Sequence, residues 1–220
     1  MADELLSDDE RAEALREWWR DNWPWIIGGV VLGIALLVGW HYWGIHKQQQ
    51  AEQAGALYRE VQTALTVSDA GKAQESLTRL TSDFDSSEYT QQARLIMAKA
   101  HVEAGKYSEA ETLLREAAEK SSDEQLVQIA QLRLARLLIQ QGKPDDAFKA
   151  LESLTAGGFA AQAREIRGDA LFAKGDAEGA RAEYAAALAS VDAQIDRTLI
   201  ELKLQDVGGV APPSAKQGQP

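Results

Sequence analysis

The chain offers few side chains that could perform catalysis. Histidine is the residue best suited to proton transfer near neutral pH, and the three present are His41, His46 and His101. The first two lie at the end of a long apolar run, and no set of His and Glu residues has the spacing of a metal site. His101 occupies a helical position that is Leu138 and Leu171 in two similar segments, so we expect it to pack as a core residue.

Other suggestive residue types also lack the pattern of an active site. The chain has no cysteine, which excludes disulfides, zinc–thiolate sites, cysteine nucleophiles and an acylated lipoprotein cysteine. Gly157-Gly158 is not followed by Lys-Ser or Lys-Thr, so it predicts a turn and not a phosphate-binding loop. Three glutamates with nearby basic residues are typical of a solvated helix face; they are Glu109, Glu111 and Glu116. We therefore expect no enzymatic activity, no metal and no cofactor.

The overall charge narrows the possible partners. The net charge of −11 gives the chain no broad electrostatic reason to bind nucleic acid or an anionic membrane surface. Ala, Leu, Glu, Gln and Lys are abundant and Pro is rare, which favours helices. The chemistry that remains is the recognition of other proteins, and it depends on how the helices are arranged.

Residues 25–45 form an apolar run in which only His41 can carry a charge. As a helix it is about 31 Å long, close to the hydrocarbon thickness of a bilayer. A cleaved signal peptide has a shorter apolar core and small residues at its cleavage site, whereas Trp, His, Tyr and Lys follow this run. We predict an uncleaved transmembrane signal-anchor. Its interfacial anchors are Trp18, Trp19 and Trp25 on one side and Trp40 and Trp43 on the other.

Two glycines within the span could form a contact with another helix. Gly29 and Gly33 are spaced as Gly-x-x-x-Gly, which lets a second helix approach closely. The alternative is that glycine is simply common in membrane helices. The first interpretation leaves open either a partner helix or a second copy of the chain.

Residues 1–24 predict an acidic, amphipathic segment at the membrane surface. Ser7 and Glu10 have the spacing of a capping box, and Pro24 is expected to redirect the chain. The segment either binds a cytoplasmic partner or serves only to set topology. A small excess of basic residues before the span favours a cytoplasmic N-terminus; the residues compared are Arg11, Arg16 and Arg20 before it and Lys47 and Arg59 after it.

Three later segments, residues 98–110, 135–147 and 168–180, align without gaps. Each begins with a small residue and has Gly seven positions later and Ala five beyond that. A large residue follows four positions after the Ala. The glycines are Gly105, Gly142 and Gly175, and the large residues are Leu114, Leu151 and Tyr184. We interpret the pattern as helix pairs in which Gly ends the first helix and the small residues allow close crossing.

This pattern resembles the tetratricopeptide repeat, whose period is about 34 residues. The chain departs from that family at its early Trp position, where Arg94, Gln131 and Arg164 stand. A degraded first unit can be placed at residues 57–84, with Ala73 and Leu77 in its second helix.

The predicted fold is therefore all-α, with a single transmembrane helix followed by a tetratricopeptide-like solenoid and a C-terminal capping helix. The domains expected are a cytoplasmic segment (1–24), the span (25–45), a periplasmic repeat domain (46–206) and a disordered tail (207–220). The capping helix should present Ile195, Leu199 and Leu202 on one face. The predicted helices are 48–67, 71–83, 87–104, 107–120, 123–141, 144–155, 159–174, 177–189 and 192–206.

First-helix positions of a stacked array line its concave surface, which predicts a partner-binding groove. Apolar residues interleaved with basic ones suit an extended or helical peptide. Two alternatives remain: Leu95, Leu132 and their neighbours are ordinary core, or the C-terminal helix fills the groove itself. The candidate residues are Leu95, Lys99, Val102, Leu132, Arg136, Ile139, Asp169 and Phe172.

The region around the span resembles one bacterial inner-membrane family. The residues concerned are Glu13–Asn22, Ile26–Val31, Gly39–Trp43 and Gln48–Tyr58. They are similar to the ancillary subunit of the SecYEG translocon, a single-span protein with a tetratricopeptide-like periplasmic domain. The resemblance covers most of the chain except the C-terminal tail.

That resemblance implies a cytoplasmic N-terminus and association with the SecYEG translocon. It also implies association with a membrane-anchored periplasmic chaperone of the peptidyl-prolyl isomerase type, and a role of the cytosolic segment in restraining an envelope-stress response regulator. It brings no catalytic residues. The leading hypothesis is a non-enzymatic, membrane-tethered adaptor that links exported proteins to periplasmic chaperones. The alternatives are a negative regulator acting through the N-terminal segment and a homo-oligomeric scaffold.

Overall fold

The computed structural model describes residues 8–190 and 195–209. Every regular element in these ranges is a helix, which confirms the predicted all-α class. The chain divides into two compact units, residues 1–52 and 53–220. The first unit holds the apolar helix, and the second holds the repeats.

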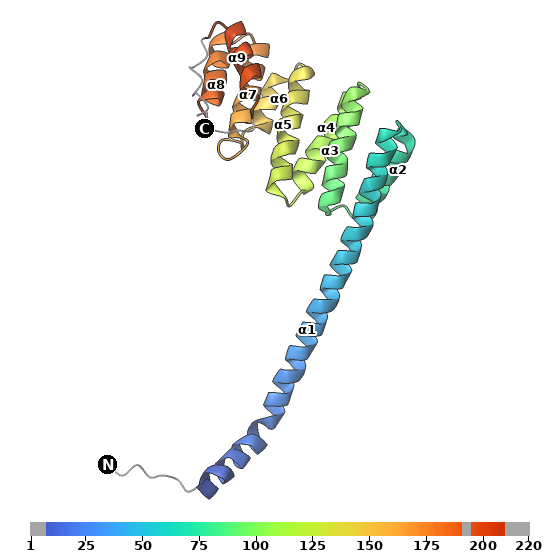
Figure 1. The fold of residues 1–220 in the computed structure, drawn as a ribbon, viewed down its shortest axis with the longest axis vertical. Coiled ribbons are helices and arrows are strands. Elements are labelled where there is room, and N and C mark those ends of the chain that lie inside the picture. The colour runs from blue at the N-terminus through green and yellow to red at the C-terminus, as the bar shows by residue number, and fades with distance from the viewer. Residues whose placement is uncertain (1–7, 191–194, 210–220) are drawn as a thin grey trace, which may run out of the picture. The chain divides into compact units, whose positions relative to one another are not determined.

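Helix α1 runs unbroken from Asp8 to Thr66 with Pro24 inside it. The prediction that a new helix begins at residue 48 is therefore wrong, and the helix passes through Pro24 without ending. Proline removes one helical hydrogen bond and crowds the preceding turn, so it bends this helix without ending it, and Figure 1 shows a bend in the blue N-terminal part. Ser7, the predicted cap, lies outside the described residues.

Within α1, the most apolar 18-residue window has a mean hydropathy of 1.9, and none of it is buried against protein. Among the described residues, α1 is the one helix long and apolar enough to cross a membrane. This agrees with the predicted anchor by length and composition.

In the second unit, helices follow one another in antiparallel pairs stacked in chain order (Figure 1). The end of α1 pairs with α2, α3 with α4, α5 with α6 and α7 with α8, and α9 follows. The bounds are α2 Ala70–Asp83, α3 Glu88–Glu103, α4 Tyr107–Lys120, α5 Glu124–Gln140, α6 Pro144–Ala150, α7 Ala160–Ala173, α8 Ala177–Ala189 and α9 Arg197–Asp206.

The repeat pattern is confirmed at its turn positions. Gly105, Gly142 and Gly175 have φ of 73°, 73° and 82°, which is the left-handed conformation predicted for the helix ends. Each is followed by a residue whose N–H donates to the carbonyl five residues back; the Lys106 N–H reaches the His101 oxygen at 2.8 Å. This is the Schellman motif that ends helices. The alanines five positions on are fully buried; they are Ala110, Ala147 and Ala180.

The degraded first unit uses the same turn with a different residue. Ser68 lies seven residues after Val61 and five before Ala73, and its φ is 58°. The following N–H, that of Asp69, donates to the Ala64 carbonyl at 2.8 Å, as in the other units. Ser68 therefore occupies the glycine position, which explains why the sequence pattern is weaker there.

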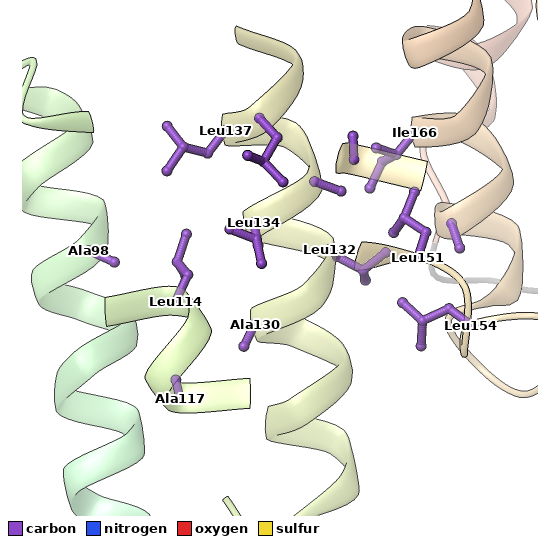
Figure 2. Packing of buried hydrophobic residues seen from close by; sticks show 14 of the residues in the cluster. Ala98, Leu114, Ala117, Ala130, Leu132, Leu134, Leu137, Leu151, Leu154 and Ile166 are labelled. Carbon is purple, nitrogen blue, oxygen red and sulfur yellow. The ribbon is translucent and has the colours of Figure 1, made fainter. Parts of the chain in front are cut away.

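The small residues make room for the large residue of the same unit, as the spacing predicts. An added Cβ on Gly168 would lie 2.4 Å from the ring of Tyr184, so that glycine makes room for the large residue of its own unit. The other units pair Ala98 with Leu114 and Ala135 with Leu151 on buried positions. Figure 2 shows how side chains from successive helices meet between α3, α5 and the segment beyond. One continuous core therefore joins α3 to α7.

After α1, two helix boundaries differ from the predicted ones by more than one residue. Helix α6 ends at Ala150 instead of residue 155. The Leu151 carbonyl accepts hydrogen bonds from the Arg167 side chain at 2.7 Å and from the Leu154 N–H at 3.0 Å, and so is not used to extend the helix. Helix α9 begins at Arg197 after the cap Asp196.

The buried face of α9 is not the predicted one. Ile200, Leu204 and Val207 are buried, whereas Leu199 and Leu202 are exposed. The spacing of four and three residues is also helical, and this face packs against Tyr184 and Leu188 of α8. Val207, which the prediction assigned to the tail, packs in this core, while residues 191–194 and 210–220 lie outside the described ranges.

Candidate partner-binding surface

A hollow of about 410 Å³ opens between α3, α4 and α5. In Figure 2, Ala98, Leu114 and Leu137 approach the same space from these three helices. Val102 adds apolar surface, and polar side chains from α3 and α5 complete the lining. The residues that line the hollow are Ala98, Lys99, Val102, Leu114, Arg133, Arg136, Leu137 and Gln140.

Three cations line this hollow, although the chain as a whole is acidic. Lys99 is largely exposed and lies 3.8 Å from Glu103 on its own helix. Arg136 lies 3.5 Å from Glu165 of α7. Arg133 donates only a long hydrogen bond, 3.4 Å, to the Leu95 carbonyl. Burial lowers the pKa of Arg133, and the nearby charge of Arg136 lowers it further. The site is therefore an apolar floor under a cluster of positive charge.

Helix α9 packs against α8 and places one charged side chain on the first helix of the last unit. Lys203 of α9 donates to Glu165 at 2.7 Å and to Asp169 at 2.8 Å. The Tyr184 hydroxyl donates to the other oxygen of Asp169 at 2.8 Å. Burial opposes the charge of Lys203, but the two carboxylates outweigh it and raise its pKa. Burial and the bond to Asp169 raise the pKa of Tyr184, so the phenol stays protonated.

Three of the eight predicted groove residues line the hollow, and the other five do not. Lys99, Val102 and Arg136 lie together in the hollow. Leu95 and Leu132 belong to the buried core, which was the alternative weighed for them. Ile139 is partly buried against that core, and Asp169 is engaged by α9 and α8. Phe172 is exposed but does not line the hollow.

Sequence reasoning missed several residues of the hollow, of which Arg133 matters most. It lies three residues before Arg136 on α5, and Leu137 and Gln140 continue the same face. A search for basic residues at helical spacing would have found it. The missed lining residues are Ala98, Leu114, Arg133, Leu137 and Gln140.

The apolar helix presents its aromatic residues outward. Trp18, Trp19, Trp25, Trp40 and Trp43 are all exposed. Trp40 and Trp43 meet edge to face with their centroids 6.0 Å apart, and the Lys47 ammonium lies 4.1 Å from the Trp43 ring centroid. Rings with this amphipathic surrounding are typical of a membrane–water boundary.

The two glycines of the span leave an open surface. An added Cβ on Gly29 or on Gly33 would have no atom within 4 Å, in contrast to the crowded Gly168. A neighbouring helix could therefore approach the backbone there.

In the described ranges, no group of three or more His, Cys, Asp or Glu residues is placed to hold a metal ion. His101 is half-buried on α3, in keeping with the packing role expected for it.

Comparison with known proteins gives a consistent family. A model described as a tetratricopeptide repeat-like domain matches residues 16–209. The chain is 29% identical over 203 residues to the ancillary SecYEG translocon subunit of Escherichia coli strain K12, covering 91% of this chain and 97% of that protein. It is 28% identical over 202 residues to the Haemophilus influenzae protein of the same name, covering 92% and 98%. A Neisseria gonorrhoeae protein of that name is 24% identical over 204 residues, with coverage of 92% and 98%. The resemblance drawn from the residues around the span is confirmed.

Proposed function

Because the chain belongs to the tetratricopeptide repeat-like family, we propose that it is a non-enzymatic, membrane-anchored adaptor of the Sec translocon. The proposal rests on the length of chain over which the similarity extends. Proteins named ancillary SecYEG translocon subunit match this chain over the apolar helix and the repeats together, at 97% and 98% of their own lengths. A relative that shared only the repeats would support protein binding in general. A shared anchor supports the same membrane machine.

The proposed topology is a single-pass protein of the bacterial inner membrane. Residues 1–24 lie in the cytoplasm, residues 25–45 span the membrane and residues 46–206 form the periplasmic repeat domain. The exposed apolar window of α1 and its outward-facing aromatic residues support the span. The excess of arginine before it supports the orientation.

The anchor is the part of the chain proposed to contact the translocon. Gly29 and Gly33 leave room for a close helix. The test is affinity purification of the tagged full chain in mild detergent, followed by detection of the three translocon subunits. We expect co-purification with the native chain and a clear loss in a Gly29→Ile/Gly33→Ile variant.

A matched variant controls for the added bulk in the membrane. Gly39→Ile/Gly44→Ile changes two glycines of the same helix that also have no neighbours within 4 Å of an added Cβ. It should retain the translocon subunits. Failure of the native chain to co-purify with them above an unrelated single-span protein would refute the proposed function.

The repeat domain is proposed to link exported proteins to a periplasmic chaperone, including a membrane-anchored one of the peptidyl-prolyl isomerase type. The support is the open hollow on α3 and α5, which joins apolar surface to charge. Chemical crosslinking from Gln140 at its rim, replaced by cysteine, should capture that chaperone. Capture of translocon subunits alone would restrict the chain to a translocon accessory.

A second proposal assigns regulation to the N-terminal segment, as negative control of an envelope-stress response regulator in the cytoplasm. Its support is the acidic and aromatic character of the segment, in which Glu13, Glu17, Trp18, Trp19 and Asp21 are exposed. Deletion of residues 2–22 with the anchor retained separates the two roles. The stress response should rise in the deletion strain while export and translocon co-purification stay unchanged, and an unaltered response would remove this proposal.

A further inference from the structure

Helix α9 packs on α8 as the next helix of the stack, and its Lys203 reaches back to α7. On α7 the first-helix positions Glu165 and Asp169 receive this lysine. The same positions on the two preceding units, three before and one after the small residue, are Leu95 with Lys99 and Leu132 with Arg136. At the last unit these positions therefore already form a charge-paired contact within the chain.

The charge at these positions reverses between the last unit and the two units before it. The last unit offers two carboxylates, which pair with one lysine. The preceding units offer Lys99, Arg133 and Arg136 around the hollow. Within the described residues, Arg133 has no carboxylate within 4 Å, and the pairs made by the other two are 3.5 Å or longer. The hollow therefore favours a ligand that brings negative charge.

The floor of the hollow also requires apolar groups from the ligand. Ala98, Val102, Leu114 and Leu137 line it. Burial of such apolar side chains favours a complex. A free phosphate or a carboxylate alone would pair with the cations but leave this floor in water. The hollow therefore favours a ligand that carries both leucine-like side chains and carboxylates.

We infer that this hollow binds an acidic amphipathic helix of a partner protein. The helix pairs its carboxylates with Lys99, Arg133 and Arg136, and it buries apolar side chains against Ala98, Val102 and Leu137. Charge complementarity at these first-helix positions already occurs within the chain, where Lys203 pairs with Glu165 and Asp169. The inference rests on the proposed adaptor function and names the chemistry of its partner.

Two synthetic peptides of matched length test it. Both place leucine at i, i+3 and i+4 spacing on an alanine background, one with glutamate and the other with lysine at the flanking positions. Fluorescence anisotropy with the detergent-solubilised full chain should show the glutamate peptide binding at least about tenfold more tightly than the lysine peptide. Equal binding of the two would overturn the inference, since the cations would then play no part.

Substitutions locate the binding to the hollow. Arg133→Gln/Arg136→Gln should weaken the glutamate peptide about tenfold or more. The control Arg79→Gln/Lys149→Gln removes the same charge from exposed residues of α2 and α6 and should bind as the native chain does. Equal loss in both variants would show an unspecific charge effect and would overturn the site.

A third variant tests the site even if Arg133→Gln/Arg136→Gln does not fold. The Lys99 side chain is 72% exposed, so Lys99→Glu leaves the core intact. It should weaken the glutamate peptide and strengthen the lysine peptide, and no change in either would count against the site. Inorganic phosphate that displaces the glutamate peptide at an ionic strength where chloride does not would identify a simple anion site instead. Translocon co-purification of the same variants is a separate readout: peptide failure with co-purification intact removes only this inference.

Discussion

At the scale of single residues, Arg94 shows how this chain departs from the repeat family it belongs to. Its side chain is 1% exposed although arginine is rarely buried. The guanidinium donates to Glu116 at 2.9 Å, to Gln91 at 2.7 Å and to Asp85 in the connection between α2 and α3. It stands at the position where the family favours an aromatic ring. In place of a packed ring, the Arg94 guanidinium thus connects α3, α4 and the loop before α3 by hydrogen bonds.

We predict that Arg94→Lys lowers the free energy of unfolding by about 2 kcal/mol, because one ammonium cannot reach three partners as a planar fork does. Chemical denaturation of the full chain in detergent, followed by circular dichroism, measures the change. Arg115→Lys is the control: Arg115 pairs with Glu111 at the surface, so that change should cost less than about 0.5 kcal/mol. Equal effects at both positions would contradict a special role of the buried guanidinium.

The Asp85 carboxylate makes the stability contributed by the Arg94 network depend on pH. Hydrogen bonds from Arg94 and from Lys120 lower the pKa of Asp85 below its ordinary value of 3.8. A lowered folded-state pKa contributes stability that is present above the unfolded-state pKa and is lost as pH falls through the folded-state pKa. We predict that Asp85→Asn costs about 1 kcal/mol at neutral pH, since the pair is partly exposed. The difference from the native chain should shrink as pH falls below about 4. A difference that stays constant in acid would contradict this origin.

At the scale of helices and turns, the spacing of small residues predicted most of the repeat domain. Gly105, Gly142 and Gly175 marked the helix ends because only a left-handed residue closes that turn without strain. The first unit was recognised only weakly because Ser68 adopts the same conformation without being glycine. The face of α9 was mispredicted because two helical registers fit its sequence, and the choice depends on which apolar residues pack against α8.

The serine turn yields a reciprocal pair of variants. A non-glycine residue in the left-handed region costs about 1 kcal/mol, so Ser68→Gly should raise the free energy of unfolding by about that amount. Gly105→Ser should lower it by a similar amount, because an added Cβ there meets nothing within 4 Å and the cost is conformational. Urea denaturation of the two variants beside the native chain measures both shifts. Shifts of the same sign would show that side-chain contacts, and not backbone conformation, decide these positions.

The contact between Gly168 and Tyr184 is a second element-scale test. Gly168→Ala places a methyl group 2.4 Å from the ring, which should destabilise the domain by about 2 kcal/mol. The other units pair Ala with Leu at these positions, so Gly168→Ala/Tyr184→Leu should be more stable than the sum of the single changes predicts. Thermal unfolding of the two single variants and the double variant completes the cycle. Additive effects would mean that the two residues do not share the packing described here.

At the scale of the whole molecule, the apolar run and the repeats could each be predicted from the sequence, whereas the hollow could be predicted only in part: Lys99, Val102 and Arg136 were among the expected residues and Arg133 was not. Hydropathy identifies the span without any tertiary information. The hollow depends on which face of α5 turns inward: Leu132 became core while Arg136, four residues on, reached the surface. Helical spacing places both on one side of the helix, and only packing separates them. The packing of α9 against α8 depends on tertiary contacts in the same way.

The orientation of the chain in the membrane decides which partners either unit can meet, and its lack of cysteine makes the test clean. Glu13 and Glu119 are exposed and lie on opposite sides of the predicted span. In cells with a permeable outer membrane, a membrane-impermeant maleimide should label Glu119→Cys at once and Glu13→Cys only after lysis. Equal labelling of both in detergent is the control for reactivity. Labelling of Glu13→Cys before lysis would reverse the topology, since arginine before the span would then face outward. The repeat domain and its hollow would then face the cytoplasm, out of reach of exported proteins.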